Sequence, residues 1–363
     1  MSTNESFKTF AEVNKPRIDK HLKAVLRLHQ IQAKTMNATY YDVVKELNVL
    51  VARGGKRMRP LLFLLAYRGY GGRRTSCALE LAVSQELLHT FLLIHDDVID
   101  RDFMRWGGPN ISAVYFEKYS QHMDAREALH MADSIAVLAG NACMTLAYDR
   151  VTASGMDNHV MLDLIRKMEQ AVFAVTAGEL ADVAGVHLKK TPTESEILAM
   201  YSAKTASYSF ALPLQMGAIA AAAPEPELEL LAGIANSLGI AFQLHDDILG
   251  VFGDEKTIGK PVMSDIREGK RTLLVVRALA EASSSDRKAL LAVLDSGNPD
   301  PTYLALACDI ITSSGARKYT EQLIAQHVAS AITAIGKTGL STNHKSNLID
   351  LANSLAIPQQ SIS

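Results

Sequence analysis

The sequence has few of the features that mark a disulfide-stabilised or nucleic-acid-binding protein. Its 363 residues include only three cysteines, Cys77, Cys143 and Cys308, and no Cys-x-x-Cys pair. A disulfide framework is therefore not expected, and a reducing cytoplasm suits the chain. The formal net charge of −2 gives no excess of basic residues, which argues against a general nucleic-acid partner.

Signals for export or membrane insertion are also scarce. Residues 1–5 lack the basic and apolar regions of a secretory signal peptide, which favours a cytoplasmic location. The longest run without a charged residue, 205–224, is rich in alanine and contains Pro213 and Gln215. We interpret it as a buried helix, and we expect no membrane span.

Strand-like alternation is scarce, whereas apolar residues recur every three to four positions over long segments. This spacing places apolar side chains on one face of a helix, and Gly and Pro mostly separate the periodic segments. The pattern predicts an all-α protein, a single-domain bundle of long helices over residues 16–363. Residues 1–15 lack a clear apolar period and are expected to form a loose N-terminal arm. The clearest helical segments are 18–28, 41–51, 61–70, 79–98 and 132–148.

An acidic pattern occurs twice and is the most informative feature present. His-Asp-Asp-Val-Ile-Asp spans 95–100 and His-Asp-Asp-Ile-Leu-Gly spans 245–250, each behind an apolar stretch. Adjacent carboxylates are costly there unless a cation neutralises them. On a helix, Asp96 and Asp100 share a face and can hold one ion. Hard oxygen ligands favour magnesium, manganese or calcium, and magnesium commonly adds phosphate oxygens to its shell, so the pattern predicts a phosphorylated substrate.

Basic residues cluster where a helix is expected to begin. Gly-Gly-Lys-Arg-Met-Arg-Pro spans 54–60 and precedes an apolar run. Because proline suits the first helical position, Lys56 and Arg59 are expected beside free amides and a helix dipole that attract anions. His89, seven residues before Asp96, lies on nearly the same helical face. A second anion site follows from this segment.

Further cationic and polar residues lie near the acidic motifs in the sequence. Taken singly, each is typical of a solvated surface. Together they supply the positive charge that a site for two diphosphates needs. They are Arg105, Lys204, Thr205, Gln243 and Lys260.

These motifs, in this order over about residues 50–275, resemble those of the trans-isoprenyl diphosphate synthases, and among them the geranylgeranyl diphosphate synthases. The resemblance implies an isoprenoid synthase fold, in which long helices surround a deep central cavity. It also implies a homodimer. It implies magnesium-dependent head-to-tail condensation of an allylic diphosphate with isopentenyl diphosphate.

The resemblance also implies a role for each matching acidic residue. Asp96, Asp100 and Asp246 would be direct ligands of three magnesium ions, and Asp97 and Asp247 would support them. The metal ions would stabilise the charge that accumulates on the leaving diphosphate as its carbon–oxygen bond breaks.

The remaining motif residues would contact the two substrates. Arg105, Lys204 and Lys260 would grip the allylic diphosphate together with the metal ions. Thr205 and Gln243 would face the allylic carbocation with oxygen dipoles, and the isopentenyl double bond would then attack that cation. The proton would leave to the departing diphosphate.

Lys56, Arg59 and His89 match the family's pocket for isopentenyl diphosphate. One departure falls in this pocket, because the family usually has a second arginine where this chain has Trp106, and that arginine helps to hold the substrate. We therefore expect weaker affinity for isopentenyl diphosphate.

Two further departures lie elsewhere. Gly250 replaces the last aspartate of the second motif, a variation that some members tolerate. Glu179 stands where many members have glutamine, and we derive no consequence for it from the sequence.

Product length is expected to depend on Phe91 and Leu92, on the helix that carries the first motif. Phe91 lies five residues before Asp96, about 7.5 Å along the axis at 1.5 Å per residue. A single aromatic ring there resembles members that stop at twenty carbons, which favours geranylgeranyl diphosphate, with farnesyl diphosphate as the alternative. Phe91 could instead simply pack the core.

Other functions compete with this interpretation. A helical metal-dependent phosphohydrolase would use His95 and Asp96 as metal ligands, but it needs further isolated histidines. A class I terpene cyclase shares the first motif and has an Asn/Ser/Glu pattern in place of the second. A catalytically weak regulatory subunit of a prenyl synthase, silenced by Trp106, is the non-enzymatic alternative, and intact aspartates in both motifs weigh against it.

Overall fold

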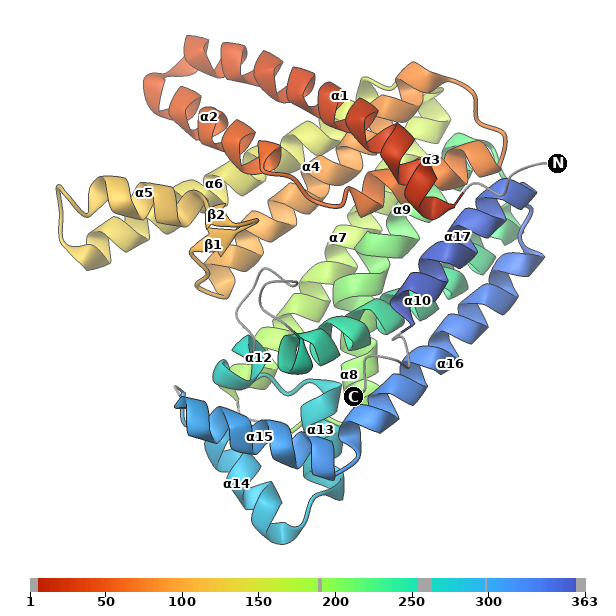
Figure 1. Ribbon diagram of the computed structural model, residues 1–363. Helices are drawn as coiled ribbons and strands as arrows, with labels where there is room; N and C mark the ends of the chain where they lie inside the picture. Colours follow the sequence, from red (N-terminus) through yellow and green to blue (C-terminus); the bar gives the residue numbers. More distant parts are fainter. Residues whose placement is uncertain (1–5, 189–190, 254–262, 298, 357–363) are drawn as a thin grey trace. The chain divides into compact units, whose positions relative to one another are not determined.

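A computed structural model describes residues 6–188, 191–253, 263–297 and 299–356. This part of the chain is almost entirely helical (Figure 1). Two short antiparallel strands, β1 (Met104–Arg105) and β2 (Gly108–Pro109), pair Met104 with Pro109 and Arg105 with Gly108. The predicted all-α class is confirmed.

The chain forms two compact units. The N-terminal unit comprises Lys8–Ile165 and Met216–Ala222, and the C-terminal unit comprises Met1–Phe7, Arg166–Gln215 and Ala223–Ser363. The single domain expected over residues 16–363 therefore contains two clusters of contacts. Each unit carries one of the two acidic motifs.

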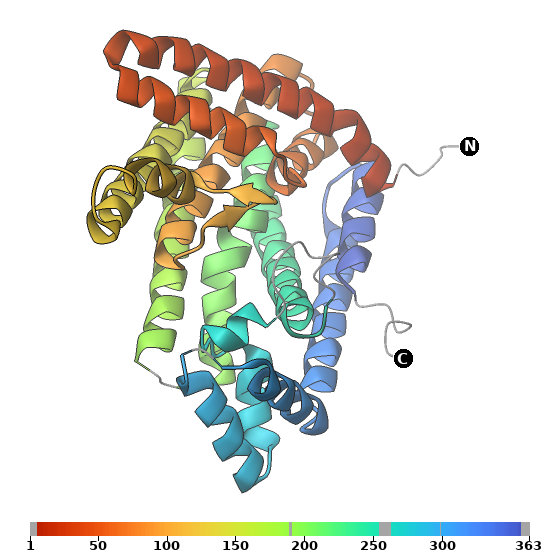
Figure 2. The same ribbon diagram turned by 60° about the vertical axis from the view of Figure 1, so that its left-hand side comes forward.

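The N-terminal unit is built from helices joined by short turns. Helices α1 and α2 run side by side as a hairpin (Figures 1 and 2), and the Asn37 side chain begins α2 by accepting a hydrogen bond from the Tyr40 amide at 2.7 Å. The helices are α1 (Phe7–Met36), α2 (Ala38–Ala52), α3 (Met58–Gly69), α4 (Thr75–Ile99), α5 (Ile111–Tyr119), α6 (Ala125–Thr152) and the beginning of α7 (Asn158–His187). They contain all the helical segments expected from the apolar spacing, apart from Tyr70, which caps α3.

The expectation of a loose arm is wrong for residues 7–15, which form the first turns of α1. Phe10 and Asn14 are buried, and they continue the spacing of four that leads to Ile18 and Leu22. Asn14 is accommodated because its side-chain amide donates to the Phe10 carbonyl at 2.8 Å. A polar residue in the apolar stripe concealed the helical period in the sequence.

Helix α4 is the core of the N-terminal unit. Residues 81–88 are buried without interruption, and α6 approaches closely at Gly140, where an added Cβ atom would collide with the His95 ring and lie 3.5 Å from the Phe91 carbonyl oxygen. Among the described residues, α4 is the one helix long and apolar enough to cross a membrane. Of that apolar window, 72% is buried within the protein.

The C-terminal unit is organised around α10. This helix lies beside α16 and against the π-helix η1 (Figures 1 and 2). From Arg166 onward the unit contains the rest of α7, α8 (Glu194–Tyr201), η1 (Ser202–Ala211), the start of α9 (Leu212–Ala220), α10 (Glu225–Phe252), α12 (Ser264–Arg267), α13 (Leu273–Glu281), α14 (Ser284–Asp295), α15 (Pro301–Ser313), α16 (Ala316–Lys337) and α17 (Thr342–Leu355).

The π-helix η1 is held between two other helices of this unit. At Gly239 of α10, an added Cβ would overlap Ala206 and lie 3.0 Å from its amide nitrogen. At Gly178 of α7, an added Cβ would lie 2.8 Å from the Cα atom of Lys204. The uncharged run 205–224 is thus helical as expected, but it is divided between η1 and α9.

We expect Gly239→Ala to lower the free energy of unfolding by about 1–3 kcal/mol, because the new methyl group overlaps the η1 backbone. Gly233→Ala on the same helix is the matched control, since its Cβ would point into open space. That variant should gain about 0.5–1 kcal/mol from helix propensity. Urea unfolding of both variants measures the difference, and equal effects would contradict the close packing.

Candidate active site

The first acidic motif lies at the C-terminal end of α4. Asp96 is partly exposed in the last turn, and Asp100 is the C-cap residue. Helix C-termini carry partial negative charge, and α4 has no basic residue in its last turn to balance it. Carboxylates placed there are stabilised by a cation from elsewhere.

Asp97, between these two residues, is buried and paired with Arg105 of β1. The Arg105 Nε atom donates to Asp97 Oδ1 at 2.7 Å, and Nη2 also contacts that oxygen. Arg105 Nη2 lies 3.6 Å from Asp96 Oδ2 and 3.5 Å from Asp102 Oδ2. Burial raises the pKa of Asp97 to about 6 against the opposing effect of Arg105. The structure thus joins Arg105 to three carboxylates.

The basic segment 54–60 differs from expectation in one respect. Helix α3 begins at Met58, and Arg57 before it is buried with a φ of 52°. Its guanidinium donates to Asp19 at 2.7 Å and to Glu86 at 2.6 Å, and also to two backbone carbonyl oxygens. The Arg57 guanidinium is therefore bound by other residues of the N-terminal unit and does not face solvent. Lys56 is exposed and Arg59 is partly exposed.

His89 lies near three basic residues of the N-terminal unit. Burial lowers its pKa well below the ordinary value, and the nearby charges of Arg59, Arg105 and Arg57 lower it further. The imidazole is therefore neutral at pH 7. His89, Leu92, Asp96 and Asp100 are all partly exposed, and their spacing of three to four places them along one face of α4.

Trp106 follows Arg105 at the tip of the hairpin and packs against the basic segment. A Cβ atom added at Gly55 would lie 3.7 Å from Trp106 Cζ2 and 3.3 Å from Arg57 Nη1. The indole ring is therefore beside the loop that carries Lys56.

The second acidic motif lies near the end of α10, where Asp246 is exposed and Asp247 is buried. The Tyr201 hydroxyl donates to Asp247 Oδ2 and accepts from the Leu273 amide at 3.2 Å. Gln243 Nε2 donates to Asp247 Oδ1 at 3.0 Å. Burial raises the pKa of Asp247 well above its ordinary value, and Asp265 adds to the effect.

Thr205 is connected to this network through Gln243. The Thr205 hydroxyl donates to Gln243 Oε1 at 2.8 Å, so the amide of Gln243 is held between Thr205 and Asp247. The structure thus brings together Thr205 and Gln243, which the sequence predicted to act on the same intermediate.

The Asp265 carboxylate lies close to Gly250, the position at which the second motif lacks its last aspartate. A Cβ atom added at Gly250 would be 3.2 Å from Asp265 Oδ2. A carboxylate of α12 therefore stands next to the position that an aspartate at 250 would occupy. The sequence places Asp265 fifteen residues further along, and no local spacing connects it with Gly250.

Lys204 lies between two carboxylates of α7 that the sequence analysis did not assign to the site. Its Nζ atom is 2.8 Å from Glu179 Oε2 and 2.6 Å from Asp182 Oδ2. Glu179 and Asp182 are three residues apart on one helix face, a spacing that could have indicated a pair.

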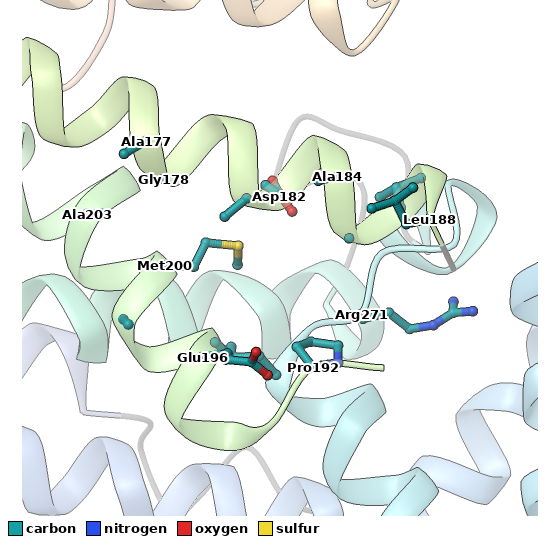
Figure 3. Close-up of a pocket in the computed structure, with 15 residues that line it drawn as sticks. Ala177, Gly178, Asp182, Ala184, Leu188, Pro192, Glu196, Met200, Ala203 and Arg271 are labelled. Carbon is teal, nitrogen blue, oxygen red and sulfur yellow. The ribbon is translucent and has the colours of Figure 1, made fainter. Parts of the chain in front are cut away.

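A pocket of about 530 Å³ adjoins this ion cluster (Figure 3). Small and apolar side chains of α7 and α8 form most of its wall, and Asp182 and Glu196 are its acidic members. The guanidinium of Arg271 points away from the labelled residues of α7 and α8 in Figure 3, and it pairs with Asp295 at 2.8 Å. Lys204 itself is not among the lining residues.

His95 turns toward α6, and Phe91 packs against the His95 ring. Phe91 is buried, and its ring meets the His95 ring edge-on with centroids 4.7 Å apart. His95 Nε2 lies 3.2 Å from the Val137 carbonyl oxygen. This contact occupies one of the two ring nitrogens of His95.

The described residues contain no group of three or more His, Cys, Asp or Glu side chains close enough to hold a metal ion unaided. Magnesium commonly takes only one or two protein carboxylates and completes its shell with water and phosphate oxygens, so the partly exposed pair Asp96 and Asp100 suits that cation. Lys260 lies outside the described residues.

Comparison with known proteins decides the family. Residues 42–311 match the polyprenyl synthetase family. The chain belongs to that family. It is a trans-prenyltransferase, an enzyme that condenses prenyl diphosphates.

Several relatives span most of the polyprenyl synthetase chain. A short-chain isoprenyl diphosphate synthase of Methanothermobacter thermautotrophicus is 35% identical over 302 residues, 83% of this chain and 86% of that protein. A geranylgeranyl diphosphate synthase of Sulfolobus acidocaldarius is 33% identical, covering 72% and 74%. A (2E,6E)-farnesyl diphosphate synthase of Mycobacterium tuberculosis is 32% identical, covering 82% and 78%.

A solved structure shows the same fold over nearly the whole chain. It is geranylgeranyl pyrophosphate synthase of Corynebacterium glutamicum complexed with isoprenyl diphosphate and magnesium, at a TM-score of 0.88 and 28% identity. The match covers 96% of this chain and 98% of the other. The predicted isoprenoid synthase fold is confirmed.

Proposed function

We propose that this enzyme joins an allylic diphosphate to isopentenyl diphosphate, head to tail and with magnesium, and that its main product is geranylgeranyl diphosphate. The observation that carries the proposal is the pair Asp96 and Asp100, which is partly exposed at the end of α4 with no basic residue in the last turn. Carboxylate oxygens four residues apart on one helix face suit a hard divalent cation.

Asp96, Asp100 and Asp246 are the proposed direct ligands of three magnesium ions. All three are at least partly exposed, whereas Asp97 and Asp247 are buried and occupied by protein donors. The relative from Corynebacterium glutamicum was crystallised with magnesium, which supports this choice of metal. When bound, magnesium stabilises negative charge on the leaving diphosphate.

The protein's own residues bind and orient the substrates. Arg105, Lys204 and Lys260 are the proposed donors to the allylic diphosphate. Lys56, Arg59 and His89 are the proposed pocket for isopentenyl diphosphate; His89 is neutral in the free protein and donates one hydrogen bond without adding charge.

Thr205 and Gln243 are proposed to stabilise the allylic cation. The Thr205 hydroxyl donates a hydrogen bond to Gln243 Oε1. The lone pairs of its oxygen therefore remain available to a positive carbon. The Asp247 carboxylate fixes the other end of the Gln243 amide, so both dipoles are in place before the cation forms.

A homodimer is the proposed assembly, in the cytoplasm. Phe173 and Leu180 are 80% and 68% exposed, and their spacing of seven puts them on one face of α7. Two large apolar side chains exposed on the same helix face support an interface there. A second copy of the chain is the proposed occupant.

Incubation of the purified protein with isopentenyl diphosphate, each short allylic diphosphate and magnesium tests the function. We expect turnover by the homomer and a twenty-carbon product by chromatography. A fifteen-carbon product would identify a farnesyl diphosphate synthase, which the Mycobacterium tuberculosis relative makes a reasonable alternative. Absence of turnover would favour the regulatory subunit.

Asp96→Ala and Asp246→Ala should each lower kcat by several orders of magnitude with the fold intact, because each removes a metal ligand and relieves repulsion between carboxylates. Asp309→Ala, at an exposed position of α15, is the matched control. Steady-state rates at several magnesium concentrations are the measurement. Near-wild-type rates with an unchanged magnesium dependence would refute the metal-site assignment.

Trp106→Arg should lower the KM for isopentenyl diphosphate by roughly tenfold, since it adds a charge-assisted donor beside the loop of Lys56. Trp106→Phe keeps an aromatic ring without charge and serves as the control. Initial rates at varied isopentenyl diphosphate and saturating allylic diphosphate distinguish the two. An unchanged or higher KM in Trp106→Arg would show that another cation already fills that role.

Phe91→Ala should lengthen the products, because removal of the ring extends the cavity along α4. Phe91→Leu removes less volume and should lengthen them less, while Leu92→Phe adds a second ring and should shorten them toward fifteen carbons. Product distributions from all three are compared after circular dichroism has checked folding, since truncation of a buried Phe costs about 3–5 kcal/mol. An unchanged distribution in Phe91→Ala would place the end of the cavity elsewhere.

A further inference from the structure

Two carboxylates of α7 contact the cation of Lys204. Its Nζ atom contacts Glu179 at 2.8 Å and Asp182 at 2.6 Å, so the three ionised side chains have a formal charge of −1. All three are largely shielded from solvent, with 22%, 18% and 18% of the Lys204, Glu179 and Asp182 side chains exposed. Solvent therefore screens their mutual interaction only in part.

The backbone holds these three residues in place. Gly178 immediately precedes Glu179, and it lets α7 approach η1 so closely that an added Cβ would lie 2.8 Å from the Lys204 Cα atom. The backbone of Lys204 therefore lies against α7, next to Glu179 and Asp182. The ion cluster follows from backbone packing as well as from the attraction of its charges.

Asp182 holds the ammonium group independently of Glu179, through its own contact of 2.6 Å. Its oxygen is the nearer of the two, and it also lines the adjoining pocket, with Gly178 on the same helix face (Figure 3). The Glu179 carboxylate adds a second negative charge at a place where an anionic substrate is proposed to bind. An anion that approaches Lys204 meets this charge at close range.

We propose that Glu179 is a positioning residue that weakens the binding of diphosphate by competing with it for Lys204. This inference rests on the proposed function, because it takes the ligand to be a diphosphate. The carboxylate lowers affinity both for the allylic diphosphate and for the inorganic diphosphate that the reaction releases. Product release is therefore favoured at the expense of tight substrate binding.

Glu179→Gln tests the proposal, because it removes the charge and keeps nearly the same shape. Isothermal titration calorimetry with inorganic diphosphate, in EDTA and again in magnesium, should show about tenfold tighter binding to the variant, as expected when one unit charge is removed next to an anion site. The KM for the allylic diphosphate should fall, while the KM for isopentenyl diphosphate stays unchanged.

Three comparisons separate this effect from a change in folding or shape. Glu179→Asp retains the charge and should keep wild-type affinity, and Glu179→Ala should bind tightly like Glu179→Gln. Glu281→Gln removes an equal charge from an exposed pair with Arg277 and should change nothing. In a Lys204→Met background, the gain from Glu179→Gln should shrink, which a double-mutant cycle measures.

Unchanged or weaker diphosphate binding in both Glu179→Gln and Glu179→Ala would overturn the inference, and would show that the carboxylate merely orders Lys204. If the wild-type enzyme condenses its substrates, that result leaves the proposed function intact. Failure of the wild-type protein to bind diphosphate in magnesium and to turn over would overturn the proposed function together with the inference.

Discussion

The site depends on one electrostatic constraint, which is the placement of carboxylates at the C-terminal ends of two long apolar helices. Burial and the helix dipole both oppose negative charge there. Neither α4 nor α10 has a basic residue in its last turn. In each motif the protein buries and satisfies the second aspartate, and leaves the first one toward solvent, where a metal ion can neutralise it.

The two buried aspartates are satisfied by different chemistry. Asp97 is paired with the charged Arg105, whereas Asp247 receives hydrogen bonds only from the neutral Tyr201 and Gln243 among its described donors. Burial raises the pKa of both, to about 6 for Asp97 and well above the ordinary value for Asp247. A raised pKa disfavours the charged form of a carboxyl group, so the negative charge of the second motif lies more on the exposed Asp246 than on the buried Asp247.

Local periodicity was enough to predict part of α1, most of α2, α3, α4 and α6, and the helical position of the first acidic motif, because these depend on residues three to seven apart. Contacts between distant segments were not predictable in this way. Arg57 is buried by Asp19 and Glu86, which are 38 and 29 residues away, and Lys204 is paired with Asp182 at a separation of 22. The sequence identifies each basic residue. Which carboxylates pair with that residue depends on the fold.

In the π-helix η1, two adjacent residues direct their side chains to different helices. Lys204 turns toward the carboxylates of α7, and Thr205 turns toward Gln243 of α10. Gly178 and Gly239 allow both neighbouring helices to approach the backbone of η1 closely. Lys204 and Thr205, proposed to face the diphosphate and the carbocation, are therefore adjacent in the chain but directed to different helices. π-helical segments occur frequently at functional sites, and here the close packing gives the geometric reason.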